Sequence, residues 1–272
     1  MTRVAVVGLG LIGGSAALAL GARGFDADPE ARARARARGI ETFETLAETL
    51  DGAEIALTAV PTAATPQLLR DIASLAPDAI LTDSASLKGP IVRAADALPP
   101  GARFVAGHPM AGSHDSGIEA ATPELFRGRP WILTRTARSD EGAFEAVARL
   151  ARKAGARVVP LDAERHDRLM TWVSHAPVAV AAALARAAED SAGPGLGEVA
   201  GPGFLGTTRV VAQPLALALE LALADPRALA DAIDGVCAEL AALSATLRRG
   251  DDAAVAEYLE KARASRRSLE TL

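Results

Sequence analysis

The glycine pattern in residues 8–13 (GLGLIG) constrains the fold of this chain more than any other feature. It follows a short β-branched run at 3–7 and opens an apolar stretch that ends at Leu20. A buried strand, a tight glycine turn and a helix in this order are typical of the first unit of a dinucleotide-binding fold. The helix start then offers unsatisfied N–H groups to a pyrophosphate. The residues expected to contact a cofactor here are Gly8, Gly10, Leu11, Ile12 and Gly13.

Strand and helix patterns alternate through the first 162 residues. This alternation predicts an α/β domain with a Rossmann-type, mainly parallel sheet. From residue 163 to 272 the chain offers alanine- and leucine-rich helical stretches and no convincing strand, which predicts a second, all-helical domain. Further strands are expected at 22–25, 54–60, 79–83, 103–106, 131–134 and 157–160, and helices at 66–75, 89–97 and 141–154.

Composition narrows the function classes. The net charge is −5, and the arginines at 32, 34, 36 and 38 alternate with alanine, which indicates a solvated helix rather than a nucleic-acid surface. The single cysteine, Cys237, excludes an internal disulfide and is expected in the helical core. Neither a signal-like segment nor an apolar run of about 18 residues is present, so we expect a soluble, cytoplasmic protein without a membrane partner. The histidine spacing predicts no metal site.

An acidic residue after the second strand usually binds the adenosine ribose. Asp26 is the candidate, and it favours NAD over NADP. The crossover helix has room for only about ten residues, so the second strand is short. Asp28 or Arg23 therefore remain alternatives for this position, and NADP remains an alternative cofactor.

His108 stands between glycines and a proline, directly after the strand expected at 103–106. A rigid strand end can hold an imidazole out toward a ligand. One poised base beside a dinucleotide site indicates hydride transfer from an alcohol.

Five segments follow one another along nearly the whole chain: residues 8–15 (GLGLIGGS), 82–88 (TDSASLK), 107–113 (GHPMAGS), 166–177 (HD through SHAP) and 203–209 (GFLGTTR). Together they resemble the prephenate/arogenate dehydrogenase family. The resemblance implies a Rossmann-type domain, a helical domain that forms a homodimer, and a small cyclohexadienol substrate that is oxidatively decarboxylated to a phenol with NAD. It also adds Val60, Pro61 and Ser84 as expected cofactor contacts.

The resemblance makes His108 the base that takes the proton of the substrate hydroxyl. Imidazole, with an unperturbed pKa of about 6.5, suits this role. Ser86 would hydrogen-bond the same hydroxyl and orient His108. Lys88 is expected either near the cofactor or in solvent, and neither His114 nor His166 is given a role.

Arg209 is the candidate for a substrate carboxylate, because a guanidinium binds a carboxylate through two hydrogen bonds. His175, Ser174 and Thr208 complete the expected substrate-binding set. Asp167, Thr171 and Ser174, spaced as i, i+4 and i+7, predict one polar stripe on a helix.

Three departures from the family pattern leave the substrate open. Val178 stands where many prephenate-specific members have a second histidine, Gly206 replaces an aspartate, and the tryptophan usual after Arg209 is missing. The lost polar contacts favour arogenate or dual use over prephenate alone.

Two other functions remain as alternatives. A β-hydroxyacid-type dehydrogenase shares the two-domain plan but requires a lysine on the first long helix of the second domain, where this chain has His175. A non-catalytic dinucleotide sensor would not need Ser86, His108 and Arg209 together.

Overall fold

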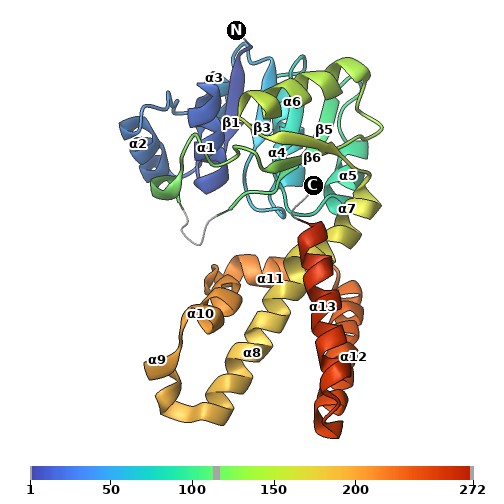
Figure 1. The fold of residues 1–272 in the computed structure, drawn as a ribbon. Coiled ribbons are helices and arrows are strands. Elements are labelled where there is room, and N and C mark those ends of the chain that lie inside the picture. The colour runs from blue at the N-terminus through green and yellow to red at the C-terminus, as the bar shows by residue number, and fades with distance from the viewer. Residues whose placement is uncertain (1, 113–116, 270–272) are drawn as a thin grey trace. The chain divides into compact units, whose positions relative to one another are not determined.

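The computed structural model describes residues 2–112 and 117–269. The chain forms two compact units, Met1–Met170 with Ala212–Leu217, and Thr171–Val211 with Ala218–Leu272. The first unit is an α/β sheet domain and the second is helical, as expected (Figure 1). The predicted boundary at 162 precedes helix α7 (Ala163–Met170), which packs with the first unit.

The first unit is built on a seven-stranded sheet in the order β2-β1-β3-β4-β5-β6-β7. Strands β1 to β5 pair in parallel, β6 runs antiparallel to β5, and β7 runs parallel to β6. The prediction of a mainly parallel sheet is therefore confirmed. The strands are β1 (Val4–Val7), β2 (Arg23–Phe25), β3 (Ile55–Thr58), β4 (Ile80–Asp83), β5 (Arg103–Pro109), β6 (Pro130–Thr134) and β7 (Arg157–Pro160).

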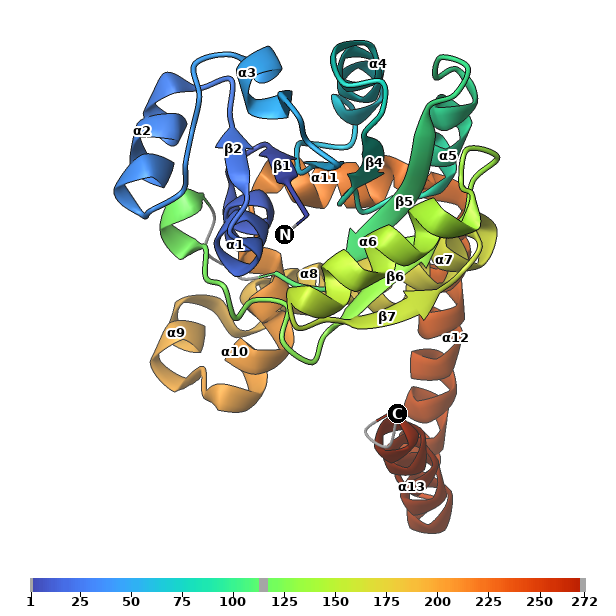
Figure 2. The same ribbon diagram turned by 90° about the horizontal axis from the view of Figure 1, so that it is seen from above.

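Helices cover both faces of this sheet. Side chains of α1 and α6 form one core cluster, and those of α3, α4 and α5 form the other (Figure 2). Alternate residues of β1 enter the two clusters, so this strand is buried on both faces, as its continuous apolar run requires. The remaining helices of this unit are α1 (Leu11–Leu20), α2 (Pro29–Ala37), α3 (Leu46–Leu50), α4 (Thr65–Leu75), α5 (Gly89–Asp96), α6 (Glu141–Lys153) and the 3₁₀ turn Ile118–Ala120.

The strand order reverses at β1, which lies between β2 and β3. In open α/β sheets, ligands bind beyond the carboxyl ends of the strands at this point. Gly8, with φ +96°, makes the turn there, and a Cβ on Gly13 would lie 1.8 Å from the Gly8 carbonyl oxygen. Both positions therefore require glycine.

Strand β5 is longer than predicted. The expected strand stops at Ala106, whereas β5 continues to Pro109 because its last four residues pair with antiparallel β6. His108 is thus a strand residue opposite Ile132, rather than a residue of the following loop.

The arginine helix α2 also differs from its prediction. Arg32 is 8% exposed and donates to the Asp26 carbonyl oxygen at 2.8 Å and to Glu44 at 2.8 Å. A solvated helix is therefore the wrong interpretation for this arginine, which ties α2 to the end of β2.

The second unit has no strand among its described residues. Its π-helical turn Thr171–His175 ends two residues before Pro177, which has no N–H to donate to the preceding turn. Wider π turns accommodate such interruptions of the hydrogen-bond pattern. Its other helices are α8 (Ala176–Ala192), α9 (Leu196–Val199), α10 (Pro202–Thr208), α11 (Leu215–Ala224), α12 (Pro226–Arg249) and α13 (Asp252–Ser268), with 3₁₀ turns at Gly193–Gly195 and Arg209–Ala212.

The second unit has a small apolar core. Its cluster of buried apolar residues is Ala176, Leu229 and Ala232. Cys237 on α12 is exposed, which corrects the expectation that it is a core residue. Among the described residues no single helix is long and apolar enough to cross a membrane, and Pro202–Ala212 and Leu215–Ala224 pass that test only as a pair bent by 80°.

Candidate active site

Asp26 lies against the glycine turn. Its Oδ2 accepts a 2.7 Å hydrogen bond from the Leu9 N–H, and its Oδ1 accepts one of 3.0 Å from the Asp28 N–H. The two alternatives have other tasks: Asp28 caps helix α2, and Arg23 donates to the Asp51 carbonyl oxygen. Asp26 is therefore the acidic residue that stands at the end of β2 beside the turn. The short crossover expected from the sequence is confirmed, since α1 has 10 residues and β2 has 3.

The glycine turn leaves room for a ligand at its middle glycine. A Cβ on Gly10 would meet nothing within 4 Å, and Gly10 starts α1 without a side-chain cap. The first N–H groups of a helix, here those of Leu11 and Ile12, lack an intrahelical acceptor and can bind a pyrophosphate. These residues fit a dinucleotide.

The other expected cofactor contacts lie in loops after neighbouring strands. Val60 and Pro61 follow β3, and the Val60 side chain packs beside Gly8. Ser84 follows β4, and its N–H donates to the Thr58 carbonyl oxygen at 3.0 Å. All three therefore lie on the same edge of the sheet as the glycine turn.

A buried ion pair holds the backbone just before His108. Beyond Val105, β5 no longer pairs with β4, and two side chains replace the missing backbone partner. Asp83 Oδ1 accepts from the Gly107 N–H at 2.9 Å, and Lys88 Nζ donates to the Gly107 carbonyl oxygen at 2.5 Å. The ammonium and the carboxylate Oδ2 are themselves 2.6 Å apart. We call Asp83 and Lys88 the strand clamp.

The strand clamp is fully enclosed, because both side chains are 0% exposed. Burial lowers the pKa of the Lys88 amino group, and the Asp83 carboxylate opposes that shift by favouring the charged form. Lys88 is therefore not in solvent, one of the two places expected for it. The clamp also needs Gly107, since a Cβ there would lie 2.6 Å from the Asp83 carbonyl oxygen.

His108 is joined to helix α7 by a chain of hydrogen bonds. Its Nδ1 lies 2.8 Å from His166 Nε2, and His166 Nδ1 lies 2.7 Å from Asp167 Oδ1. His166 is 0% exposed, so this contact is shielded from water. No role was expected for His166, and the structure places it directly against the expected base.

Asp167 anchors this chain to the start of helix α5. It accepts from the backbone N–H of Lys88 at 2.9 Å and of Gly89 at 2.8 Å. Burial alone would raise the pKa of Asp167, but the hydrogen bonds from His166 and from the two N–H groups outweigh it and lower the pKa. Asp167 is thus held as a carboxylate.

Ser86 lies half-buried in the loop between β4 and α5. Within the described residues it makes no hydrogen bond to His108, and the partner that orients the imidazole in the structure is His166. His114 and Ser113 lie outside the described residues.

The expected substrate-binding residues belong to the second unit. His175 is 3% exposed and Ser174 half-buried, both in the π-helical turn. The predicted stripe of Asp167, Thr171 and Ser174 assumed regular α-helical spacing, and this wider turn interrupts it. Thr208 closes helix α10 with its hydroxyl bonded to the Phe204 carbonyl oxygen, and Arg209 follows it as an exposed residue.

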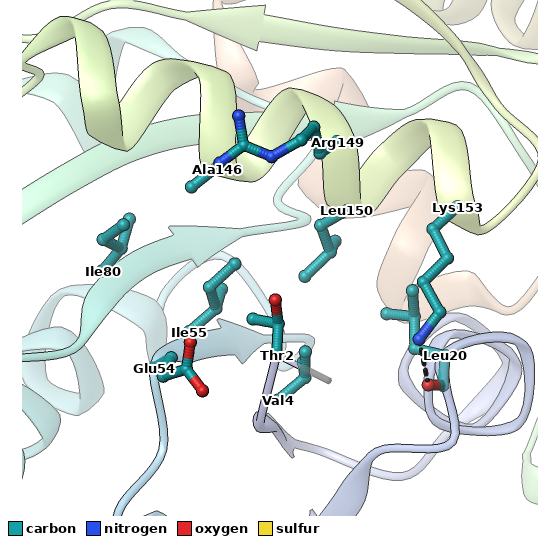
Figure 3. A pocket seen from close by; sticks show the side chains of 10 residues that line it. All are labelled: Thr2, Val4, Leu20, Glu54, Ile55, Ile80, Ala146, Arg149, Leu150 and Lys153. Atoms are coloured by element: carbon teal, nitrogen blue, oxygen red, sulfur yellow. Dashed lines mark hydrogen bonds between the residues drawn. The ribbon is translucent and has the colours of Figure 1, made fainter.

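A cavity in the first unit lies away from this site. Side chains from the starts of β1, β3 and β4 line it together with Arg149, Leu150 and Lys153 of α6 (Figure 3). In parallel strands the starts lie opposite the carboxyl ends, where the glycine turn and His108 are found. This cavity is therefore not part of the candidate active site. In the part of the chain that the structure describes, no group of three or more His, Cys, Asp or Glu residues is arranged to hold a metal ion.

Two family models cover most of the chain. The prephenate dehydrogenase nucleotide-binding domain matches residues 20–160, and the prephenate dehydrogenase dimerization domain matches residues 162–261. The chain belongs to the prephenate dehydrogenase family.

Three relatives match this chain over 78% to 100% of their own length. Prephenate dehydrogenase of Lactococcus lactis is 30% identical over 99% of this chain and 78% of its own. The crystal structure of Aquifex aeolicus prephenate dehydrogenase in complex with hydroxyphenyl propionate and NAD+ is 29% identical, with a TM-score of 0.88 over 99% of this chain and 98% of the other. Synechocystis arogenate dehydrogenase is 28% identical, with a TM-score of 0.83 over 98% and 100%.

We expect the strand clamp to contribute to the stability of the folded protein. Lys88→Met should lower the free energy of unfolding by about 3–5 kcal/mol, because it leaves the buried Asp83 carboxylate without its counter-charge. Urea denaturation measures the change. Lys261→Met is the matched control, since Lys261 forms an exposed ion pair with Glu257. A Lys88 variant as stable as the control would show that the clamp contributes nothing.

Proposed function

We propose that this chain catalyses the NAD-dependent oxidative decarboxylation of prephenate, arogenate or both, the dehydrogenase step of tyrosine biosynthesis. The observation that carries the proposal is His108, held by the strand clamp near the carboxyl end of β5, on the sheet edge that also presents the glycine turn. A base and a dinucleotide site on one edge of one sheet are what hydride abstraction from an alcohol requires.

In the proposed reaction His108 holds a proton for part of each turnover. It takes the proton of the C4 hydroxyl as that oxygen becomes a carbonyl and a hydride leaves C4. Loss of the C1 carboxylate as CO2 then sends its electron pair into the ring, and the carbonyl oxygen becomes that of a phenol. That oxygen takes a proton back, so His108 can return the one it accepted. The base therefore ends each turnover in its starting state.

The cofactor site is assigned to the glycine turn and its neighbours. NAD, when bound, supplies the hydride acceptor. The N–H groups of Leu11 and Ile12 would hold the pyrophosphate, and the Asp26 carboxylate would accept from the adenosine ribose hydroxyls. Arg32, the buried arginine nearest to Asp26, already binds Glu44 and the Asp26 carbonyl oxygen. The negative charge of Asp26 at this place favours NAD over NADP.

Substrate recognition is proposed for residues from several segments of the chain. Ser86 and His108 would meet the C4 hydroxyl, and Arg209 would bind a carboxylate. His175, Ser174 and Thr208 are also proposed to bind the substrate. Val178 and Gly206 stand where the family commonly has polar side chains. The absence of these polar groups supports arogenate, or both arogenate and prephenate, as the substrate.

We propose that residues 163–272 form a homodimer. Exposed leucines on the long helices support this: Leu240 and Leu247 of α12 are 55% and 58% exposed, and Leu259 of α13 is 51% exposed. Exposed leucines on helices that bury only a small apolar cluster are typical of helices that pack against another copy of the chain.

The function is tested by supplying prephenate and arogenate, each with NAD and with NADP, and following reduction of the nicotinamide. We expect turnover with NAD and at least one of the two substrates. His108→Asn should lower turnover by roughly two to four powers of ten while NAD affinity is unchanged. An enzyme inactive in all four assays would contradict the proposed function, and unchanged turnover in the variant would remove His108 from the mechanism.

Arg209→Ala should raise the KM for the substrate roughly ten- to a hundredfold, because it removes charge-assisted hydrogen bonds to a carboxylate. Steady-state kinetics measure the effect. Arg248→Ala, at an exposed arginine of the same unit, is the control and should leave KM unchanged. An unaltered KM in the Arg209 variant would refute its carboxylate role.

The homodimer is tested by sedimentation. The wild-type chain should sediment at twice the mass of one chain, and the double variant Leu240→Glu, Leu247→Glu should shift toward the monomer because it places charge in the proposed interface. Leu75→Glu, at a leucine that is 50% exposed on α4 of the first unit, should remain dimeric. A monomeric wild-type chain would exclude the dimer.

A further inference from the structure

We infer that His166 and Asp167 are positioning residues which set the tautomer of His108 and stabilise its protonated form, an assignment that rests on the proposed function of His108 as the base. The observation is the unbroken hydrogen-bonded chain from His108 Nδ1 through His166 to Asp167 Oδ1, with separations of 2.8 and 2.7 Å.

The direction of each hydrogen bond follows from the chemistry of the groups. A carboxylate only accepts, and Asp167 already accepts from two backbone N–H groups, so His166 must donate to it from Nδ1. A neutral His166 then carries its lone pair on Nε2, which accepts from His108 Nδ1–H. The lone pair of His108 is consequently on Nε2, the nitrogen that the proposed reaction needs as a base.

The same chain stabilises the charge that forms when His108 takes a proton. The imidazolium donates from Nδ1 to His166, which is polarised by the carboxylate behind it. Because His166 is fully buried, this interaction acts in a low local dielectric, where it is stronger than in water. The titratable and charged groups near Asp167 in the described structure include His166 in contact, Lys88 nearby, and Arg93, whose guanidinium lies beside Gly89.

Helix α7 is built to present this pair. Asp162 caps its start, accepting from the Arg165 N–H at 2.7 Å, and α7 packs on α5, whose first N–H groups bind Asp167. A histidine that merely filled space would need neither the carboxylate nor its fixed orientation.

The first test measures the tautomer directly, without turnover. In protein with ¹⁵N-labelled histidine, the His108 signals are assigned by their loss in His108→Asn. Wild-type His108 should carry its proton on Nδ1 when neutral. Asp167→Asn should weaken this preference, because a neutral amide supports the Nδ1–H of His166 less strongly than a carboxylate does. A wild-type His108 protonated on Nε2 would overturn the inference.

The second test is kinetic. Asp167→Asn should lower kcat by up to about 10⁴-fold, which is the loss that the same carboxylate-to-amide change causes in a Ser-His-Asp triad. It should also move the acid limb of the kcat/KM profile to lower pH, since the variant no longer favours the imidazolium. Loss of activity with an unmoved acid limb would indicate a structural role only.

Two further variants complete the design. His166→Ala should be partly rescued by added imidazole, while NAD affinity reports that the protein is folded, and absence of rescue in a folded variant counts against the inference. Glu164→Gln is the control, because Glu164 is an exposed carboxylate on α7 that pairs with Arg168. If the wild type turns over neither substrate but His108 shows the expected tautomer, the proposed function fails and the orientation of the imidazole stands.

Discussion

The arrangement of this site depends on one interaction, the buried ion pair of Asp83 and Lys88. It replaces the backbone partner that β5 loses when it passes the end of β4, and it holds both polar groups of Gly107. Without it the last residues of β5 would be paired on one side only, with β6. The backbone just before His108 is therefore fixed by a buried ion pair in the core.

A second carboxylate, Asp167, acts on the same residue by a different route. Asp83 fixes where the main chain runs, whereas Asp167 acts through His166 on the imidazole itself. One side chain comes from the end of a strand and the other from a helix that begins 80 residues later in the chain. Asp83 therefore positions the backbone, and Asp167 acts on the protonation of the imidazole.

Much of the fold could be predicted from the sequence, because local sequence patterns determine its strands, helices and turns. The glycine turn, the parallel strands and the helical second unit follow from spacing and periodicity. The burial of Arg32 and the extension of β5 could not, because they depend on partners distant in sequence, Glu44 and β6. For the site, His108 stood out through its glycine and proline neighbours. His166 did not, although the adjacent His-Asp pair was a signal: a carboxylate beside a histidine can fix its proton.

The place where Asp167 is anchored has a consequence for how this protein can change over time. Among the described residues, the donors to Asp167 include two main-chain N–H groups, at Lys88 and Gly89. Any residue except proline supplies such a donor, but a Cβ on Gly89 would lie 2.9 Å from Asp167 Oδ2, and the Lys88 side chain belongs to the strand clamp, so both positions are constrained. A substitution at either position would therefore disturb one of the two carboxylates that act on His108, and we expect both residues to change little over time.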